Sequence, residues 1–417
     1  MKRPKALIMA GGRGARLFPV TNDIPKPLAP VANIPVVAHA LDALRRSGIE
    51  EAAITLGYRG DMIKRYFSSY GTCGVAVTPF EEETPLGTAG GAASARGFFD
   101  CDFIALGGDT LFDFDVSGAL DLHRRRGALA TIIVSHSDEP CRYGTVVCDG
   151  IGKIKSFCEK PEWKNVLSDK ISTGIYVLSP EIFDFIPRGA PCDFAKDVFP
   201  RIINDMYAYE TDGYFCDVGT LSSYLFANMK MSGGKNCVSP GANVSPGARV
   251  ERSVILNGAF VGDGATVCDS IVCQGAVIMK GAVAARAVCA PLSVLSEGAT
   301  AEENADISEK IKRTASKASA KARSRLAFAE TAEEFVCGAH VISGTVAAPH
   351  GSAKTVGEMI RRGAETEKDG ARLDFSGGSV TLSCVDADTL RLRAASFDKK
   401  RAKELFGYAE NGVERLF

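Results

Sequence analysis

The stretch Ala6–Pro27, ALIMAGGRGARLFPVTNDIPKP, decides the fold of the N-terminal part of this chain. It opens with the apolar run 6–10, which predicts a buried strand. Gly11, Gly12 and Gly14 follow the run directly. Glycines let backbone N–H groups approach an anion closely, because they adopt positive φ and carry no side chain. The stretch therefore predicts a buried strand that ends in a phosphate-binding loop.

Charged residues within and after the glycine loop strengthen this prediction. Arg16 carries a planar donor fork suited to phosphate. Pro25 and Pro27 hold Lys26 in a stiff extended segment, where its ammonium can act as a point charge. No Gly-Lys-Ser/Thr follows the glycines, so the loop is not a Walker loop. The alternative is a plain strand-to-helix turn, which would explain the glycines but not these cations.

Helix and strand patterns alternate after the loop. Apolar spacing predicts helices at 36–47, 61–70 and 92–96, with a glycine-rich turn at 85–91, and strands at 52–56, 75–79, 103–106 and 130–135. This alternation predicts a Rossmann-like α/β domain over residues 1–232, with a mixed, mainly parallel sheet. Ligands of such sheets gather at the C-terminal ends of the strands.

The segment GGRGARLFPVTNDIPKP resembles the signature GGxGxRLxPxTxxxPKP of the sugar-1-phosphate nucleotidylyltransferases, and the resemblance covers about the first 230 residues. It implies that Arg16 and Lys26 act in catalysis and that Gly11, Gly12 and Gly14 bind the nucleotide. FEEETPLGTAG at 80–90 also resembles a nucleotide-contacting segment of that family. The likeness implies that Gly87, Thr88 and Gly90 contact the nucleotide; the alternative is a simple helix N-terminus.

Two aspartates far apart in the sequence are the expected metal ligands. Asp109 follows the predicted strand 103–106, and Asp217 lies in GYFCDVG, which resembles the family's GYWxDIG. The resemblance implies that both bind Mg²⁺, which prefers oxygen ligands and usually adds substrate phosphates. Their convergence is a prediction. Asp113 and Asp115 lie past the turn and are expected to be solvated.

Two further segments resemble the part of the family that binds the sugar phosphate. Glu159 and Lys160 match the EKP motif, in which the carboxylate binds sugar hydroxyls and the ammonium holds phosphate. The segment STGIY resembles the family's N[TA]GIY, with Ser172 in place of the usual Asn. The resemblance implies that Ser172 and Gly174 contact the sugar phosphate, together with Gly144 of the preceding YGTVV segment.

The pattern changes at about residue 236. Valines recur six residues apart at 238, 244 and 250 and in two later runs, with glycines at the corresponding turns. This hexapeptide spacing predicts a left-handed parallel β-helix over 236–300, with three to four coils if each takes three hexapeptides. SVI at 253–255 and SIV at 270–272 shift the phase. Acyltransferases of this kind need a histidine in or beside the coils. Because none lies between 137 and 339, we expect a structural, oligomer-forming unit.

The last part of the chain is predicted to contain a linker and a small domain. Residues 301–350 are expected to be helical or a linker, because Ala, Lys, Ser and Glu dominate the first part. Residues 351–417 predict a small α+β domain, with strands at 371–375, 379–383 and 390–395, a hairpin turn at 377–378, and helices at 356–362 and 398–406. It resembles a degenerate final domain of the phosphohexomutases. Ser383–Thr389 replaces the phosphate loop, so no mutase activity is expected.

Composition indicates an ordinary globular protein. The 417 residues carry a net charge of −1, which gives no general attraction to nucleic acid or membranes. The 13 cysteines show no zinc-site spacing, and the N-terminus leads straight into a strand. We therefore expect a cytoplasmic protein with reduced thiols, no membrane span and no signal peptide.

The resemblance implies transfer of a nucleotidyl group from a nucleoside triphosphate to a hexose 1-phosphate, with release of pyrophosphate. The whole architecture most resembles bacterial mannose-1-phosphate guanylyltransferases, so GTP and mannose 1-phosphate are the expected substrates. Glucose 1-phosphate with UTP, dTTP or ATP is the alternative. A regulatory subunit that binds nucleotide sugar without catalysis, or a partner-binding module in the C-terminal region, are hypotheses of other classes.

Overall fold

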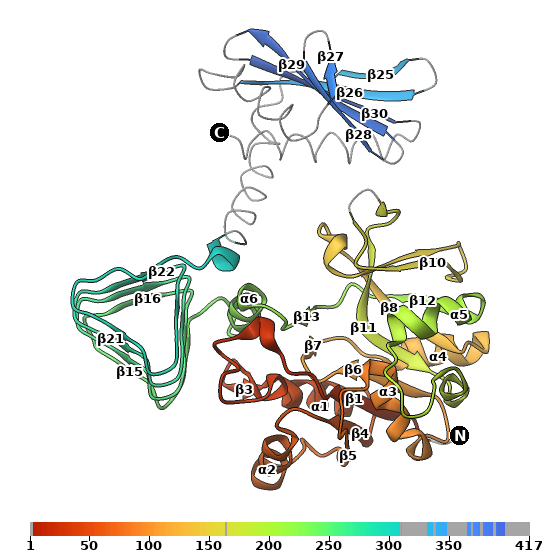
Figure 1. Ribbon diagram of the computed structural model, residues 1–417, viewed down its shortest axis with the longest axis horizontal. Helices are drawn as coiled ribbons and strands as arrows, with labels where there is room; N and C mark the ends of the chain where they lie inside the picture. The colour runs from red at the N-terminus through yellow and green to blue at the C-terminus, as the bar shows by residue number, and fades with distance from the viewer. Residues whose placement is uncertain are drawn as a thin grey trace. The chain divides into compact units, whose positions relative to one another are not determined.

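The computed structural model describes residues 3–162, 165–308 and 310, and the backbone of the strands between 332 and 396. The chain divides into two compact units, Met1–Lys310 and Ile311–Phe417. The first unit contains an N-terminal α/β domain followed by a parallel β-helix (Figure 1).

The N-terminal domain is built on a mixed nine-stranded sheet, with the strand path β10-β9-β11-β6-β1-β4-β5 and β8 and β12 attached beside β11. The strands are β1 (Lys5–Ala10), β4 (Glu51–Leu56), β5 (Ala76–Glu81), β6 (Phe103–Gly107), β8 (Ala130–His136), β9 (Gly144–Cys148), β10 (Ile154–Glu159), β11 (Lys170–Leu178) and β12 (Met206–Glu210). β1 is parallel to β4 and β6, and β4 is parallel to β5. β11 runs antiparallel to β6 and β8, so the sheet is mixed, as predicted.

Helices cover both faces of this sheet. The helices of the domain are α1 (Val36–Arg46), α2 (Gly60–Tyr70), α3 (Gly87–Ser94), α4 (Ser117–Arg126), α5 (Phe199–Ile202) and α6 (Leu221–Met231), of which α1 to α5 contribute to the two cores of the sheet. Alternate residues of β1 point into two separate cores. Ile8 packs in the core that includes α1, α2 and α4, whereas Leu7 packs in the core that includes α3 and α5. The domain therefore has the three layers expected of a doubly wound sheet.

Two short strand pairs complete the domain. β2 (Pro30–Val31) pairs with β3 (Ile34–Pro35), and β7 (Thr110–Phe112) pairs antiparallel with β13 (Phe215–Asp217). The fully buried Tyr224 of α6 donates its hydroxyl proton to the carbonyl of Pro30 at 2.7 Å. Helix α6, the last element before the β-helix, is thereby fixed to the segment that follows Lys26.

The β-helix has three parallel sheets of four, four and three strands, which make three complete coils and two sides of a fourth. The sheets are β14 (Cys237–Val238), β17 (Val254–Ile255), β20 (Ile271–Val272) and β23 (Val288–Cys289); β15 (Asn243–Val244), β18 (Phe260–Val261), β21 (Val277–Ile278) and β24 (Val294–Leu295); and β16 (Arg249–Glu251), β19 (Thr266–Cys268) and β22 (Val283–Ala285). The predicted parallel β-helix is thus present; its left-handed sense stays a prediction.

Each coil is shorter than three hexapeptides, because one corner lacks a residue. Ser253 and Ser270 occupy equivalent corners and lie 17 residues apart in sequence. The preceding residues, Arg252 and Asp269, have φ of 43° and 49°, which turns the chain sharply there. This short corner explains why the SVI and SIV segments shift the phase of the repeat.

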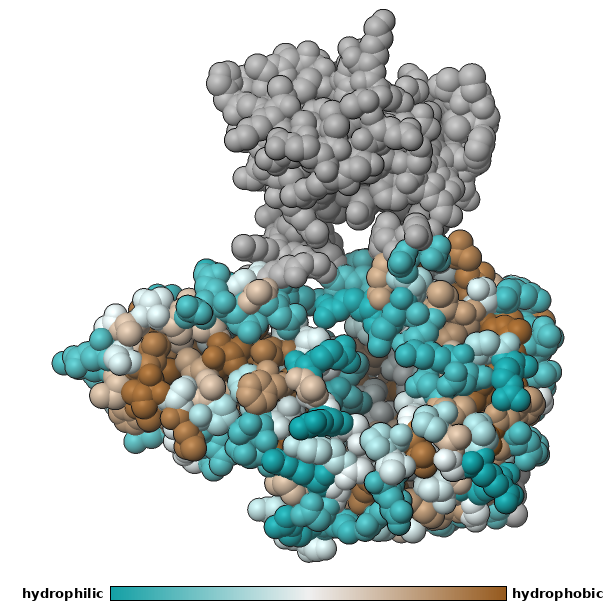
Figure 2. All heavy atoms as spheres, viewed as in Figure 1, coloured by the Kyte–Doolittle hydropathy of each residue, from teal (hydrophilic) through white to brown (hydrophobic). Residues whose placement is uncertain are grey.

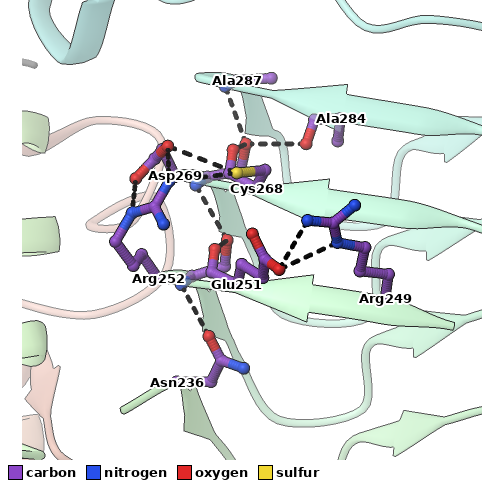
Figure 3. Close-up of polar contacts among 10 residues, drawn as sticks. Asn236, Arg249, Glu251, Arg252, Cys268, Asp269, Ala284 and Ala287 are labelled. Atoms are coloured by element: carbon purple, nitrogen blue, oxygen red, sulfur yellow. Dashed lines mark hydrogen bonds and ion pairs between the residues drawn. The ribbon is translucent and has the colours of Figure 1, made fainter. Parts of the chain in front are cut away.

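A ladder of buried serine side chains supports the short corner (Figure 3). The backbone N–H of Ser270 donates to Ser253 Oγ at 3.1 Å, and the N–H of Ala287 donates to Ser270 Oγ at 3.0 Å. At the bottom of the ladder, Asn236 Oδ1 accepts from the N–H of Ser253 at 3.2 Å. The ladder satisfies corner N–H groups that would otherwise be buried without a partner.

The described part of the second unit is a six-stranded antiparallel sheet with the order β25-β26-β30-β29-β28-β27. The strands are β25 (Ala332–Val336), β26 (Ala339–Ala347), β27 (Glu365–Glu367), β28 (Gly370–Phe375), β29 (Gly378–Asp386) and β30 (Thr389–Ser396). The three strands predicted between 371 and 395 are confirmed, and β28 and β29 pair as the predicted hairpin. The helices predicted at 356–362 and 398–406 lie outside the described residues, and the likeness to a mutase domain stays a prediction.

The prediction that residues 301–350 are helical or a linker is wrong for β25 and β26. β26 pairs with β30 along its whole length, and it is rich in β-branched residues, among them Val341, Ile342 and Val346. The Ala- and Lys-rich composition that favours a helix belongs to the sequence before β25. The predicted helix or linker over 301–350 therefore extends too far toward the C-terminus.

Candidate active site

Asp109 and Asp217 lie side by side because of the β7–β13 strand pair. In that pair Asp217 is opposite Thr110, the residue that follows Asp109. The N–H of Val218 also donates to the carbonyl of Asp109 at 3.1 Å. The predicted convergence of the two aspartates is therefore present in the structure, although 107 residues separate them (217 − 109 − 1).

The Lys26 ammonium joins the two carboxylates. Its Nζ forms an ion pair with Asp109 and a second one with Asp217 Oδ1 at 3.2 Å. Only 9% of Lys26 is exposed. Burial by itself would lower the pKa of Lys26, but the two carboxylates outweigh this effect and raise its pKa above the usual value. Lys26 is therefore a permanently charged group at this position.

Asp217 is the more exposed of the two carboxylates. Its side chain is 46% exposed, compared with 28% for Asp109. Loss of hydration among the surrounding residues and the neighbouring Asp109 carboxylate raise the pKa of Asp217, and Lys26 and Arg16 oppose that rise. Asp217 thus lies in an acidic environment that an additional cation would relieve.

The glycine loop borders the ends of β1, β4 and β5. The N–H of Tyr58, which follows β4, donates to the carbonyl of Gly11 at 3.2 Å. A methyl group placed on Gly11 would lie 2.8 Å from Glu82 Oε1, whereas one placed on Gly12 would meet no atom within 4 Å. Gly14 has φ of 66°, and a methyl group on it would lie 2.7 Å from Lys26 Cβ. The loop is thus in contact with the stem of Lys26 and remains open at Gly12.

Sequence analysis did not single out Glu82. This residue follows β5 directly, and its N–H donates to the carbonyl of Leu56 at 2.7 Å. Its carboxylate lies against the α-carbons of both Gly11 and Gly91, at positions that any side chain there would occupy. A carboxylate at the C-terminal end of a strand beside a glycine loop was the signal that could have identified it.

Gly87, Thr88 and Gly90 pack α3 against the segment around Cys192. The turn predicted at 85–91 is wrong in extent, because α3 begins at Gly87. Methyl groups on Gly87 and Gly90 would lie 2.6 and 2.9 Å from the carbonyl oxygens of Cys192 and Ala190. Thr88 Oγ1 donates to Asp193 Oδ2 at 2.8 Å. Close packing explains these three residues without a nucleotide, and their expected contact with one stays a prediction.

The structure brings the expected sugar-phosphate residues together on three neighbouring strands, β10, β9 and β11. Glu159 of β10 is paired with Gly144 of β9, and a methyl group on Gly144 would lie 2.9 Å from Glu159 Oε2. Lys160 has φ of 47°, and its Nζ lies 3.5 Å from Glu159 Oε1. Lys160 is 56% exposed at its side chain, so its ammonium is accessible to an anion.

Ser172 and Gly174 lie at an irregularity of β11. The β11–β8 register shifts between Ser172 and Tyr176, and the N–H of Gly174 donates to Ser172 Oγ at 3.2 Å. Gly174 has φ of 77° and nothing within 4 Å of an added methyl group, so the backbone there faces open space. The hydroxyl that replaces the usual amide is therefore used, at least in part, to stabilise this local turn.

Asp113 and Asp115 have structural partners rather than places beside Lys26. Asp113 Oδ1 accepts from the N–H of Tyr214 at 2.7 Å, and Asp115 Oδ1 accepts from the N–H of Ser117 at 2.9 Å. Among the described residues, no cluster of three or more His, Cys, Asp or Glu side chains could enclose a metal ion. No helix in the described ranges is long and apolar enough to cross a membrane.

Comparison with known proteins supports the division seen in the structure. Residues 5–233 match the family model described as nucleotidyl transferase, and residues 227–319 match the GlmU-like C-terminal hexapeptide model. The crystal structure of HddC from Yersinia pseudotuberculosis is similar, with a TM-score of 0.50 and 28% identity. That similarity covers 55% of this chain and 99% of HddC.

Curated relatives include enzymes named for different substrates. A UTP–glucose-1-phosphate uridylyltransferase of Synechocystis is 36% identical over 272 residues, which are 61% of this chain and 70% of that protein. A probable mannose-1-phosphate guanylyltransferase 2 of rice is 36% identical over 229 residues, or 53% of this chain and 63% of that protein. The fission yeast mannose-1-phosphate guanyltransferase is 36% identical over 233 residues, 53% of this chain and 62% of that protein. The chain thus covers less than two thirds of the rice and yeast proteins.

The family model spans more than half of the chain and includes the strand, the glycine loop, Lys26 and both aspartates described above. Its match agrees with the doubly wound sheet and with the position of these residues at the strand ends. The chain belongs to the nucleotidyl transferase family, and its N-terminal domain is followed by a GlmU-like hexapeptide region.

Proposed function

We propose that the protein transfers a guanylyl group from GTP to mannose 1-phosphate, giving GDP-mannose and pyrophosphate. The observation that carries the proposal is the contact of Lys26 with Asp109 and Asp217 beside an open glycine loop. The reaction needs no protein nucleophile, because the sugar phosphate oxygen attacks the α-phosphorus in line and pyrophosphate leaves. The protein supplies positioning and charge neutralisation.

Each charged residue has a specific role in this proposal. The N–H groups of the glycine loop, Arg16 and Lys26 hold the triphosphate and the leaving pyrophosphate. Glu159 accepts hydrogen bonds from the sugar hydroxyls, and Lys160 holds the phosphate of the sugar. The glycine loop follows β1 and Glu159 ends β10, two strands of one sheet with β9, β11 and β6 between them, so a single rigid sheet positions both sets of groups.

Mg²⁺ fits the pair Asp109 and Asp217. The donor set consists of carboxylate oxygens, which this ion prefers, and Mg²⁺ usually binds through one or two carboxylates plus substrate phosphates. The exposed edge of Asp217 leaves room for such phosphates. When bound, Mg²⁺ would neutralise charge that develops on the phosphate oxygens.

Glu82 is the residue that favours GTP over other nucleotides. An ionised carboxylate only accepts hydrogen bonds. Guanine presents two adjacent donors, N1–H and the 2-amino group, which one carboxylate can accept together. Uracil and thymine present a single N–H between two carbonyl oxygens, which a carboxylate would repel. Glu82 lies at the glycine loop, with its carboxylate against the α-carbons of Gly11 and Gly91.

The test of this assignment is a comparison of GTP, ITP and UTP in wild-type protein and in Glu82→Gln. ITP lacks the 2-amino group, so the wild type should use it at least roughly tenfold less well than GTP by kcat/KM. The variant should lose most of this discrimination while it still releases pyrophosphate. Equal use of GTP and ITP by the wild type would remove Glu82 from guanine recognition.

A glucose-1-phosphate uridylyltransferase is the second candidate. It is favoured by the Synechocystis relative, whose match to this chain extends over 272 residues. It predicts that the wild type uses UTP better than GTP and glucose 1-phosphate better than mannose 1-phosphate. The same nucleotide comparison distinguishes the two candidates.

We also propose that a second copy of the chain binds the β-helix. The outward side of the β15-β18-β21-β24 sheet carries Phe260, Val277 and Val294 in one row, and Val294 is 62% exposed. Figure 2 shows hydrophobic residues gathered on the β-helix. Val294→Asp should shift the mass measured by light scattering toward the monomer, and an unchanged mass would remove this face from the interface.

A further inference from the structure

The Lys26 ammonium occupies the position at which a cation would meet both acidic side chains. It contacts Asp109 and lies 3.2 Å from Asp217 Oδ1, and its own residue is 9% exposed. The stem lies against Gly14, where only the absence of a side chain leaves room for it. Within the described residues, the charges that face Lys26 most closely are therefore these two carboxylates.

The charges at this position do not cancel. One ammonium faces two carboxylates, so the ionised cluster keeps one net negative charge. If the ammonium left, the two carboxylates would face each other beside the β7–β13 strand pair, with Arg16 as the remaining positive charge that acts on Asp217. A divalent cation that entered while Lys26 stayed would be repelled by the ammonium at short range.

We propose that Lys26 is the resident counter-ion of the Asp109–Asp217 pair, and that a divalent cation and the lysine compete for these carboxylates. A divalent cation alone therefore binds the nucleotide-free protein weakly. Binding becomes tight when a triphosphate attracts the lysine away from the carboxylates. This inference rests on the proposed function for the identity of the triphosphate, but not for the competition itself.

The local structure allows the lysine to move. Pro25 and Pro27 fix the backbone on either side, so the ammonium can change position only by rotation about the side-chain bonds of Lys26. The carboxylates of Asp109 and Asp217 are partly exposed, so water or a metal ion can reach them when the ammonium leaves. The glycine loop that would hold the triphosphate touches the lysine stem, so the ammonium is within reach of both partners.

Competition of this kind links the two ligands. If nucleotide binding raises the affinity for the cation, the cation must raise the affinity for the nucleotide by the same factor. The predicted order is that the cation enters together with the triphosphate. The lysine thereby disfavours cation binding to the protein before the triphosphate has bound.

The test is a titration of the full-length protein with Mn²⁺, followed by the electron paramagnetic resonance signal of free Mn²⁺. The variants are Lys26→Met, which keeps the stem and removes the charge, and Lys26→Arg, which keeps the charge. Without nucleotide, Lys26→Met should bind Mn²⁺ at least about tenfold more tightly than the wild type. Lys26→Arg should remain as weak as the wild type, and Asp109→Asn in the Lys26→Met background should abolish the gain.

A non-hydrolysable GTP analogue provides the second half of the test. The analogue should raise the Mn²⁺ affinity of both proteins. The factor should be about tenfold larger for the wild type than for Lys26→Met, because the variant has no lysine to displace. Equal or weaker Mn²⁺ binding to Lys26→Met without nucleotide would overturn the competition. If the wild type bound Mn²⁺ only through the analogue and Asp109→Asn made no difference, the metal assignment in the proposed function would also fail.

Discussion

The cluster of Lys26, Asp109 and Asp217 and the corner of the β-helix use buried polar groups in opposite ways. In the cluster, Lys26 neutralises only one of two neighbouring carboxylates, and both carboxylates remain partly exposed. In the β-helix, Ser253 and Ser270 are fully buried, and their hydroxyl oxygens accept backbone protons from the next coil. The first arrangement leaves negative charge that a cationic ligand could neutralise, whereas the buried hydroxyls already have hydrogen-bond partners within the fold. The difference separates residues suited to binding a ligand from residues that stabilise the fold.

Asp109→Ala should produce the largest effect, and it should appear in activity. By analogy with the loss of one electrostatic stabiliser, turnover should fall about 10²–10³-fold. The turnover of Lys26→Ala should fall by a similar factor. The measurement is steady-state pyrophosphate release. Asp115→Ala is the matched control, because Asp115 accepts from Ser117 and lies outside the Lys26 cluster. A near-normal rate for Asp109→Ala would contradict the assignment.

Ile278→Ala tests the other side of the comparison. Ile278 is fully buried in the core of the β-helix. The cavity should lower the free energy of unfolding by about 2–5 kcal/mol. Amide hydrogen exchange of the β18 and β21 backbone should speed up accordingly, while kcat at low temperature stays within about twofold of the wild type. A selective loss of kcat with unchanged exchange would contradict the separation of the two regions.

Ser270→Ala should have an intermediate effect. The N–H of Ala287 would lose its acceptor in a fully buried corner, which costs about 1–3 kcal/mol. Denaturant unfolding followed by circular dichroism measures this cost. Ser293→Ala is the control, because Ser293 is only partly buried and its hydroxyl donates to the local carbonyl of Ala290. Equal stability of the two variants would mean that the serine ladder does not stabilise the corner.

The smallest predicted effect is a change in the pH dependence of stability. His123 is 1% exposed, and burial lowers its pKa below the usual 6.5. The unfolded state therefore takes up a proton first, and the contribution of His123 is lost as the pH falls below 6.5 toward the pKa of the folded state. Asp102 and Arg124 are the charged groups that face His123 most closely.

His123→Gln should flatten this acid limb in urea titrations at a series of pH values. His136 provides a comparison of opposite sign, because hydrogen bonds to Glu210 and Asp169 raise its pKa. Its contribution is present below about 6.5 and is lost as the pH rises through the pKa of the folded state. If the free energy of unfolding changed with pH equally in the wild type and His123→Gln between pH 6.5 and about 5.5, the buried neutral imidazole would be contradicted.

The sequence was sufficient for elements with a strong period or a specific motif. The glycine loop and the β-helix follow from local patterns, and the convergence of Asp109 and Asp217 follows from the resemblance to a known family; the structure contains all three. Three features depended on information that local patterns lack. Helix α3 contains glycines that a propensity argument excludes, because Gly90 needs close contact with Ala190.

The other two features concern Glu82 and the strand β26. Glu82 follows β5 in sequence and contacts Gly11 because the sheet places the end of β5 near the end of β1. β26 becomes a strand through long-range pairing with β30, which begins 42 residues after β26 ends (389 − 347). Both cases show tertiary contacts that decide the role of a residue after the local pattern has been read.

The central claim is tested most directly by pyrophosphate release in the presence of Mg²⁺. The experiment covers GTP, UTP, dTTP, ATP and CTP, each with mannose, glucose and N-acetylglucosamine 1-phosphates. The account predicts release that is strongest with GTP and mannose 1-phosphate and that disappears in Asp109→Ala. Folded protein that binds nucleotide sugar tightly but releases no pyrophosphate with any pair would contradict it, and would identify a regulatory subunit instead.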